Sequence, residues 1–225
     1  MLRAAVFAAS VCAVGLASAA PVPAPSEKEQ IATLWGKTAG GGGFELKGKQ
    51  LTLRADGDAA NLRVTRTVRG DFTAEVVVVE AACPDATKGD SMNPQSQAGL
   101  SVTGGDYRLE LHLLQMFNRG DDKLFQKEPQ RCVWVDRWFP RGGSGAMLKD
   151  MGTHRSVRLR VSRAGEALTV AHSFDGKEWS DPVDVSEKLE LPEEVTVAVY
   201  FSHTTHQALH ATFDKLTVEK PKPKK

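Results

Sequence analysis

The stretch from Ser156 to Trp179, SVRLRVSRAGEALTVAHSFDGKEW, constrains the fold more than any other part of the chain. Apolar residues alternate with polar ones in two runs, which predicts two extended strands that each bury one face. The apolar positions are Val157, Leu159 and Val161, and then Leu168, Val170 and Phe174. Asp175-Gly176 supplies the positive-φ dipeptide of a tight turn, so the stretch reads as a unit of a β-sandwich. His172 shares the parity of the second run and is expected to be buried with a hydrogen-bond partner, and Trp179 is expected to cover that end of the core.

Short strand-like segments recur along the rest of the sequence between turn signals. They lie at 44–46, 50–54, 62–68, 72–80, 98–102, 107–113, 132–135, 182–185, 195–201 and 208–218. The unbroken run Val76 to Val79 is typical of a central strand, and the change of parity near Asp214-Lys215 predicts a β-bulge. We expect the region from Met116 to His154 to be irregular apart from its strand at 132–135. Ten or eleven short strands without a clear helix predict an all-β fold of two packed sheets rather than a barrel.

The two ends of the chain differ in composition from this strand-rich region. Residues 1–19 have the pattern of a secretory signal peptide: Arg3, an apolar run, and the small residues Ala17-Ser18-Ala19 before the cleavage site. A linker is expected at 20–33, where Ser26 and Glu29 could start one helical turn, followed by the sandwich at 34–219 and a basic disordered tail at 220–225. The sequence therefore predicts a secreted or periplasmic protein with no membrane span once the signal is removed.

The charge balance argues against a polyanionic partner. The 29 basic residues include Arg3, so removal of the signal leaves as many basic as acidic side chains, of which there are 28. We therefore expect no nucleic-acid partner. Oligomeric state is not readable from the sequence.

Two cysteines, Cys83 and Cys132, remain after signal removal. An even pair in an oxidising compartment predicts a disulfide. The alternative is two buried free thiols that pack as small apolar groups.

Several short motifs resemble one superfamily. These are Gln97-Ala98-Gly99-Leu100, the strand at 157–161, the turn Phe174-Asp175-Gly176-Lys177-Glu178-Trp179, the strand at 195–200 and Ala211-Thr212-Phe213-Asp214. Together they resemble the concanavalin A-like lectin/glucanase superfamily, within it the bacterial DUF1349-type domains and, more distantly, the DUF1080-type 3-keto-disaccharide hydrolase sandwiches. The resemblance spans about 34–218 and implies a jelly roll of two curved antiparallel sheets whose concave face commonly holds sugar.

The acidic strand of the superfamily's glucanases is only partly present. Where those enzymes have Glu-x-Asp-x-x-Glu, this chain has Glu110-Leu111-His112-Leu113-Leu114-Gln115, with one carboxylate of three. Hydrolysis by two carboxylates is therefore disfavoured on this strand, although a loop could supply the second from Asp121, Asp122 or Asp136. The metal-site pattern of legume lectins is not seen.

A sugar-binding platform is the first candidate site. Aromatic faces stack on sugar rings, and charged side chains bind sugar hydroxyls, which favours Trp134, Arg137, Trp138 and Tyr200. Arg108, Glu110 and His112 lie on the side of their strand opposite the leucines and could line the same groove; Glu110 and His112 are also the weak catalytic candidates. The alternatives are that the tryptophans cap the core and that the charged side chains form a solvated cross-strand set.

Other polar clusters do not reach a recognisable ligand set. His203, His206 and His210 lack an accompanying cysteine or acid at ligand spacing, and Asn118, Asp121 and Asp122 lack the EF-hand spacing. No Gly-x-Ser-x-Gly elbow is present. We therefore assign no metal ligands and no cofactor from the sequence.

These observations predict an exported β-sandwich that binds carbohydrate, a glycoconjugate or another extracellular ligand on a concave face without catalysis. The second hypothesis is an enzyme, a glycoside hydrolase or lyase of the 3-keto-disaccharide hydrolase type. The third is a structural or interaction module without a small-molecule site.

Overall fold

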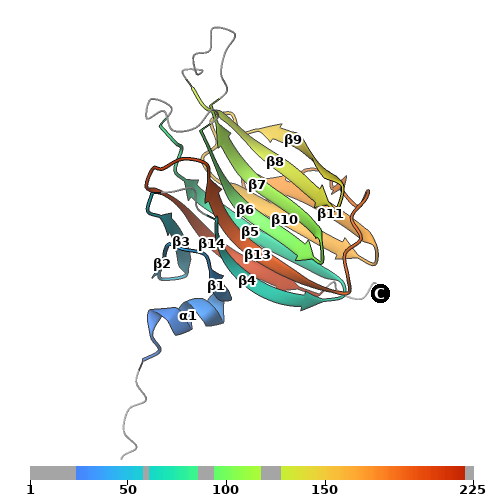
Figure 1. Ribbon diagram of the computed structural model, residues 1–225, viewed down its shortest axis with the longest axis horizontal. Coiled ribbons are helices and arrows are strands. Elements are labelled where there is room, and N and C mark those ends of the chain that lie inside the picture. The colour runs from blue at the N-terminus through green and yellow to red at the C-terminus, as the bar shows by residue number, and fades with distance from the viewer. Residues whose placement is uncertain (1–23, 58–60, 86–93, 118–127, 221–225) are drawn as a thin grey trace, which may run out of the picture.

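The computed structural model describes residues 24–57, 61–85, 94–117 and 128–220. In this part of the chain, fourteen strands form two antiparallel seven-stranded sheets that pack face to face (Figure 1). The predicted all-β jelly-roll sandwich is thus confirmed. The predicted signal peptide and all of the basic tail except Lys220 lie outside the described residues.

The first sheet contains the strand pair that carries the candidate residues. Its order is β1 (Lys37–Ala39), β4 (Asn61–Arg69), β13 (Glu194–His203), β6 (Gln95–Gly104), β7 (Tyr107–Met116), β8 (Gln130–Phe139) and β9 (Gly142–Asp150). The second sheet has the order β12 (Val183–Asp184), β11 (Ala167–Ser173), β10 (Val157–Ala164), β5 (Phe72–Ala81), β14 (Leu209–Glu219), β3 (Gln50–Ala55) and β2 (Gly43–Lys47). The run of valines in β5 therefore lies in a central strand, as expected.

The core fills the space between the inner faces of the two sheets. Leu109, Leu111 and Leu113 of β7 are fully buried in it, as are Leu159 and Val161 of β10. Burying a side chain of this size stabilises the fold by about 1.5–3 kcal/mol. Because side chains alternate along a strand, the residues between the three leucines point to the opposite side of the first sheet, which we call the outer face.

One short helix packs at the edge of the sandwich beside β1 and β2 (Figure 1). Helix α1 (Glu27–Leu34) begins at a complete capping box between Ser26 and Glu29 and buries Ile31 against the core. It ends where Gly36 has a φ of 129°, a conformation that side chains rarely adopt. The helix is longer than the single turn expected within the linker.

The region between Met116 and His154 is more regular than expected. Strand β8 extends well beyond 132–135, and Gly142–Asp150 forms the edge strand β9, which pairs with β8 over its length. The sequence did not reveal β9 because its glycines and exposed side chains leave no alternation of apolar residues. The bulge predicted in the last strand is confirmed, with Lys215 at a φ of 56°.

The hairpin from Ser156 to Trp179 forms β10 and β11 in the expected register. His172 is half-buried rather than buried, and its ring packs against Phe174 with the centroids 5.2 Å apart. Trp179 does not cover the core. Its ring lies under the Arg160 guanidinium, 3.6 Å away, on the side of the second sheet that points away from the core. The prediction for Trp179 is therefore wrong, because the turn at Asp175-Gly176 directs the following chain over the outside of β10.

The two cysteines are free thiols, so the expected disulfide is not formed. Arg131, which interacts electrostatically with Cys83, immediately precedes Cys132 in β8. Cys132 is buried opposite Leu114 in the β7–β8 pair, whereas Cys83 follows the end of β5.

None of the helices in the described ranges is long and apolar enough to cross a membrane.

Candidate functional site

The outer face of the first sheet gathers six of the seven predicted ligand-binding residues. In the pairing of β7 with β8, Arg108 lies opposite Trp138, Glu110 opposite Asp136, and His112 opposite Trp134. Directly opposed residues share a face of the sheet, so the pairs form three adjacent rows. The six residues on this face are Trp134, Trp138, Tyr200, Arg108, Glu110 and His112.

Arg137 is the exception. It lies between Asp136 and Trp138 on β8, so strand alternation turns it to the opposite face. Its Nε donates to the Ser144 hydroxyl at 3.1 Å across the β8–β9 pair. The expectation that Arg137 joins the sugar platform is therefore wrong for geometric reasons.

A buried pair forms the floor of the site. The Tyr200 hydroxyl and His112 Nδ1 are 2.7 Å apart, and the two side chains are 1% and 0% exposed. Burial lowers the pKa of His112 to about 3, because the charged imidazolium would lose its hydration. The ring is therefore neutral at physiological pH, and its other nitrogen, Nε2, has no hydrogen-bond partner.

Glu110 lies beside this pair and is held by two arginines. Its Oε1 accepts from Arg63 Nη2 at 3.1 Å and lies 3.5 Å from Arg108 Nε. Burial raises the pKa of this carboxyl group, while Arg108 and Arg63 act in the opposite direction. Because Glu110 is only 4% exposed, its charge is balanced by protein groups rather than by water.

Asp136 is the more accessible of the two carboxylates. Its Oδ1 accepts from the Trp134 indole Nε1 at 2.9 Å, and its Oδ2 lies 3.8 Å from His112 Nε2. The side chain is 19% exposed. Burial raises the pKa of Asp136, and the hydrogen bond from Trp134 opposes that shift.

The tryptophans lie over glycines of the edge strand. Gly143 lies opposite Trp138 and Gly145 opposite Asp136, and a Cβ atom on Gly145 would lie 2.4 Å from Asp136 Oδ1 and 2.7 Å from the Trp134 Nε1. Because these two glycines have no side chains, they leave space that the indoles occupy. Both indoles are half-buried, and the Arg108 guanidinium lies 4.1 Å from the centroid of the Trp138 ring.

Sequence reasoning missed Arg63 and the two glycines, and it placed Asp136 in a loop. Arg63 comes from β4, distant in sequence, and reaches the site because β4, β13, β6 and β7 are neighbours in the sheet. Trp134, Asp136 and Trp138 occupy alternate positions, a period of two that would have indicated a longer strand. The sheet order itself was not visible in the sequence.

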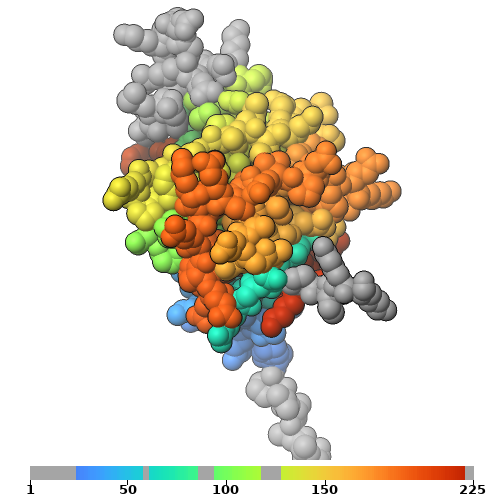
Figure 2. Space-filling view, turned by 90° about the vertical axis from the view of Figure 1, so that its right-hand side faces the viewer, coloured from blue at the N-terminus to red at the C-terminus, as the bar shows by residue number. Residues whose placement is uncertain are grey.

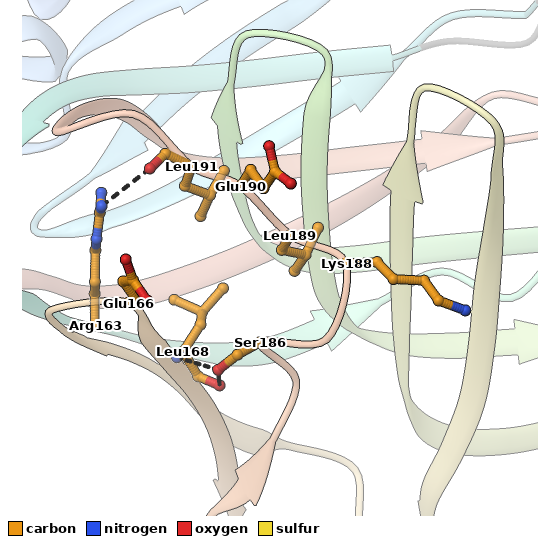
Figure 3. Close-up of a pocket in the computed structure, with 8 residues that line it drawn as sticks. All are labelled: Arg163, Glu166, Leu168, Ser186, Lys188, Leu189, Glu190 and Leu191. Carbon is orange, nitrogen blue, oxygen red and sulfur yellow. Dashed lines mark hydrogen bonds between the residues drawn. The ribbon is translucent and has the colours of Figure 1, made fainter.

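A pocket lies elsewhere, between the β10–β11 turn and the segment that follows β12, which share one face of the molecule (Figure 2). It has a volume of about 540 Å³ and is formed around the loop at 186–191 (Figure 3). Several polar groups of the pocket hold this loop in place. Arg163 donates to the Leu191 and Pro192 carbonyls at 3.1 and 2.6 Å, and the Leu168 N–H donates to the Ser186 hydroxyl. These bonds indicate a structural role.

The remaining sequence candidates do not form a site in the described ranges. His203 is buried, and its Nδ1 lies 3.4 Å from the Thr205 backbone nitrogen. It does not converge with His206 and His210 on a common ligand position. Asn118, Asp121 and Asp122 lie outside the described residues. Among the described residues, the grouping that could hold a metal is Glu110, His112 and Asp136, whose ligand atoms lie within 4.8 Å of one another.

Comparisons with known proteins support the fold. No family model and no curated protein matches the sequence. A functionally unknown protein from Saccharomyces cerevisiae aligns with a TM-score of 0.61 at 15% identity, over 80% of this chain and 92% of that one. The legume lectin-like domain from Entamoeba histolytica aligns with a TM-score of 0.52 at 9% identity, over 92% of this chain and 100% of that domain. At these identities the likeness concerns the fold, which is the concanavalin A-like sandwich that the sequence motifs indicate.

Proposed function

We propose that this chain is an exported carbohydrate-binding protein whose binding surface is the outer face of the first sheet, centred on Trp134 and Trp138. One observation carries the proposal: two half-exposed indoles lie on the same face of β8, on either side of Asp136 and next to glycines of the edge strand, and Arg108 stacks on Trp138. A sugar ring has an apolar CH face that stacks on such a surface and hydroxyls that bind neighbouring charged groups.

The burial of the floor supports binding rather than catalysis. Glu110 and His112 are almost inaccessible, and Glu110 is neutralised by arginines, so neither side chain is free to reach a glycosidic bond. The lectin-like fold of the Entamoeba histolytica domain is compatible with this function. Export and the relation to DUF1349-type domains belong to the same proposal and rest on the sequence motifs.

A glycan array tests the proposal directly. We expect the wild-type chain to bind a subset of glycans, and Trp134→Ala and Trp138→Ala to lose about fivefold or more in affinity, because a lost aromatic stacking contact costs on the order of 1 kcal/mol or more. Trp179→Ala is the matched control, since Trp179 is also half-buried and stacked with an arginine, but on the other sheet. Absence of binding to every glycan, or equal loss with Trp179→Ala, would contradict the proposal.

Enzymatic action on glycosides is the second candidate function, and one observation favours it. Asp136 stands directly opposite Glu110, so the second carboxylate that the sequence lacked on this strand comes from β8. Incubation with glycosides and 3-keto-glycosides, scored for released sugar, tests this function. Release by the wild type that is abolished in Asp136→Asn would establish catalysis, and absence of release would leave the binding function.

A further inference from the structure

The strongest unexplained feature of the outer face is the buried His112 Nε2. The imidazole is 0% exposed, and this nitrogen has no hydrogen-bond partner. Buried polar atoms in native proteins almost always have a partner, so this unpaired ring nitrogen is available to a ligand. The nearest acidic oxygen, Asp136 Oδ2, is 3.8 Å away, too far for a hydrogen bond.

We propose that Glu110, His112 and Asp136 bind a first-row divalent cation such as Zn²⁺, with His112 Nε2 as the nitrogen ligand. The inference is separate from carbohydrate binding and does not rest on it. Imidazole and carboxylate together suit this class of ion.

The distances fit such an ion. Two ligands that are each about 2.1 Å from a zinc ion lie at most about 4.2 Å apart. The 3.8 Å between His112 Nε2 and Asp136 Oδ2 falls within that limit. All three ligand atoms lie within 4.8 Å of one another, so small side-chain rotations bring Glu110 to the ion as well.

The surroundings prepare His112 for this role. The Tyr200 hydroxyl lies 2.7 Å from Nδ1, and when it accepts the Nδ1 proton it fixes the tautomer in which Nε2 carries a free lone pair. Such partners on the other ring nitrogen are typical of metal-binding histidines. The 19% exposure of Asp136 provides an entry from solvent.

Two cations compete with the proposed ion. Arg63 and Arg108 both contact Glu110 Oε1, and the Tyr200 hydroxyl also bonds this carboxylate, so the metal has to share Glu110 with these groups. Their positive charges weaken the attraction of a cation. The proposal therefore predicts that removing the Arg63 charge increases metal affinity, an effect that a purely structural charge cluster would not produce.

Isothermal titration of the chelator-treated, dialysed chain with ZnCl₂, without sugar, tests the site. We expect one Zn²⁺ per chain, at least about tenfold weaker binding in Asp136→Asn, and tighter binding in Arg63→Gln. Asp136→Asn keeps an oxygen that can accept from Trp134. Asp106→Asn in the exposed β6–β7 turn is the matched control and should bind like the wild type.

Absence of Zn²⁺ binding by the wild type would overturn the proposal. So would unchanged affinity in Asp136→Asn, or an Arg63→Gln variant that binds no more tightly than the wild type. Circular dichroism checks that each variant is folded. If Asp136→Asn is unfolded, His112→Asn replaces it, because asparagine retains a polar group near Tyr200 and removes the ligating nitrogen; unchanged affinity of that variant would equally exclude the site.

Discussion

At the scale of single residues, the Tyr200–His112 pair is the most consequential contact of the outer face. Each partner lies on a different strand, and both are buried, so the bond satisfies two polar groups that water cannot reach. Neither residue belongs to the hydrophobic core cluster. The pair therefore links β7 and β13 across β6 on the side away from the core.

Tyr200→Phe should lower the free energy of unfolding by about 1–3 kcal/mol, because it leaves His112 Nδ1 buried without a partner. Urea unfolding measures the change. Tyr107→Phe is the matched control: it removes the chain's other tyrosine hydroxyl, whose bond to Glu190 at 3.2 Å is exposed, and should change stability by less than about 0.5 kcal/mol. Equal effects of the two variants would contradict the buried hydrogen bond.

The cysteines allow a second test at this scale. Burial raises the pKa of both Cys83 and Cys132 to about 11, so at pH 8 the reactive thiolate is scarce. We expect slow alkylation by iodoacetamide in the native chain, a rate that increases with pH towards 11, and rapid modification of both thiols in denaturant without reductant. Mass spectrometry counts the added groups. A native chain that gains modifiable thiols only after reduction would instead contain the disulfide.

At the scale of elements, the hairpin of β8 and β9 determines the shape of the proposed binding surface. Strand β9 packs only Leu148 against the core, and its contribution to the site is the glycines beside the two indoles. The periodicity of apolar residues therefore does not indicate β9, although this strand has a defined place in the sheet. Its register is set by pairing with β8 rather than by burial.

Gly145→Ala should weaken glycan binding by several-fold while leaving Trp134 in the sequence. The added Cβ would lie 2.4 Å from Asp136 Oδ1 and 2.7 Å from the indole Nε1, closer than a carbon normally approaches, so both side chains have to move. Glycan-array titration measures the loss. Gly41→Ala is the matched control, since a Cβ there meets no atom within 4 Å; a variant at Gly145 that binds like the wild type would show that the indole position is not important.

At the scale of the whole molecule, the strands contribute to one continuous core between the two sheets. Leu111, at the centre of β7, is fully buried in it. Leu111→Ala should destabilise the chain by about 3 kcal/mol through lost burial and an unfilled cavity, measured by urea unfolding. The same substitution at Leu34, which is 41% exposed, should cost less than about 1 kcal/mol; similar values for the two would contradict the burial of Leu111.

The strand pattern, the turn at Asp175-Gly176 and the bulge near Lys215 could be predicted because they depend on local alternation and on backbone conformations available to few residues. The helix was anticipated through its Ser26 and Glu29 capping box, although not its length. Strand β9 could not be predicted, because only Leu148 in it packs against the core and its apolar residues do not alternate with polar ones.

The candidate site was predicted only in part for a related reason. Alternation alone placed Arg108, Glu110 and His112 on the side opposite the leucines, and that prediction is confirmed. Asp136 lies beside them because β8 extends beyond the predicted strand. Arg63 lies beside them because of the order of strands in the sheet.

The sequence by itself thus determined the class of fold and the face of each strand, because side-chain parity is a local property of the backbone. The tertiary structure alone decided which strands are neighbours, and with them the pairing of Glu110 with Asp136, the burial of His112 and the free state of the two cysteines. Strand order is set by the burial of all inner faces at once, so no single stretch of sequence contains it.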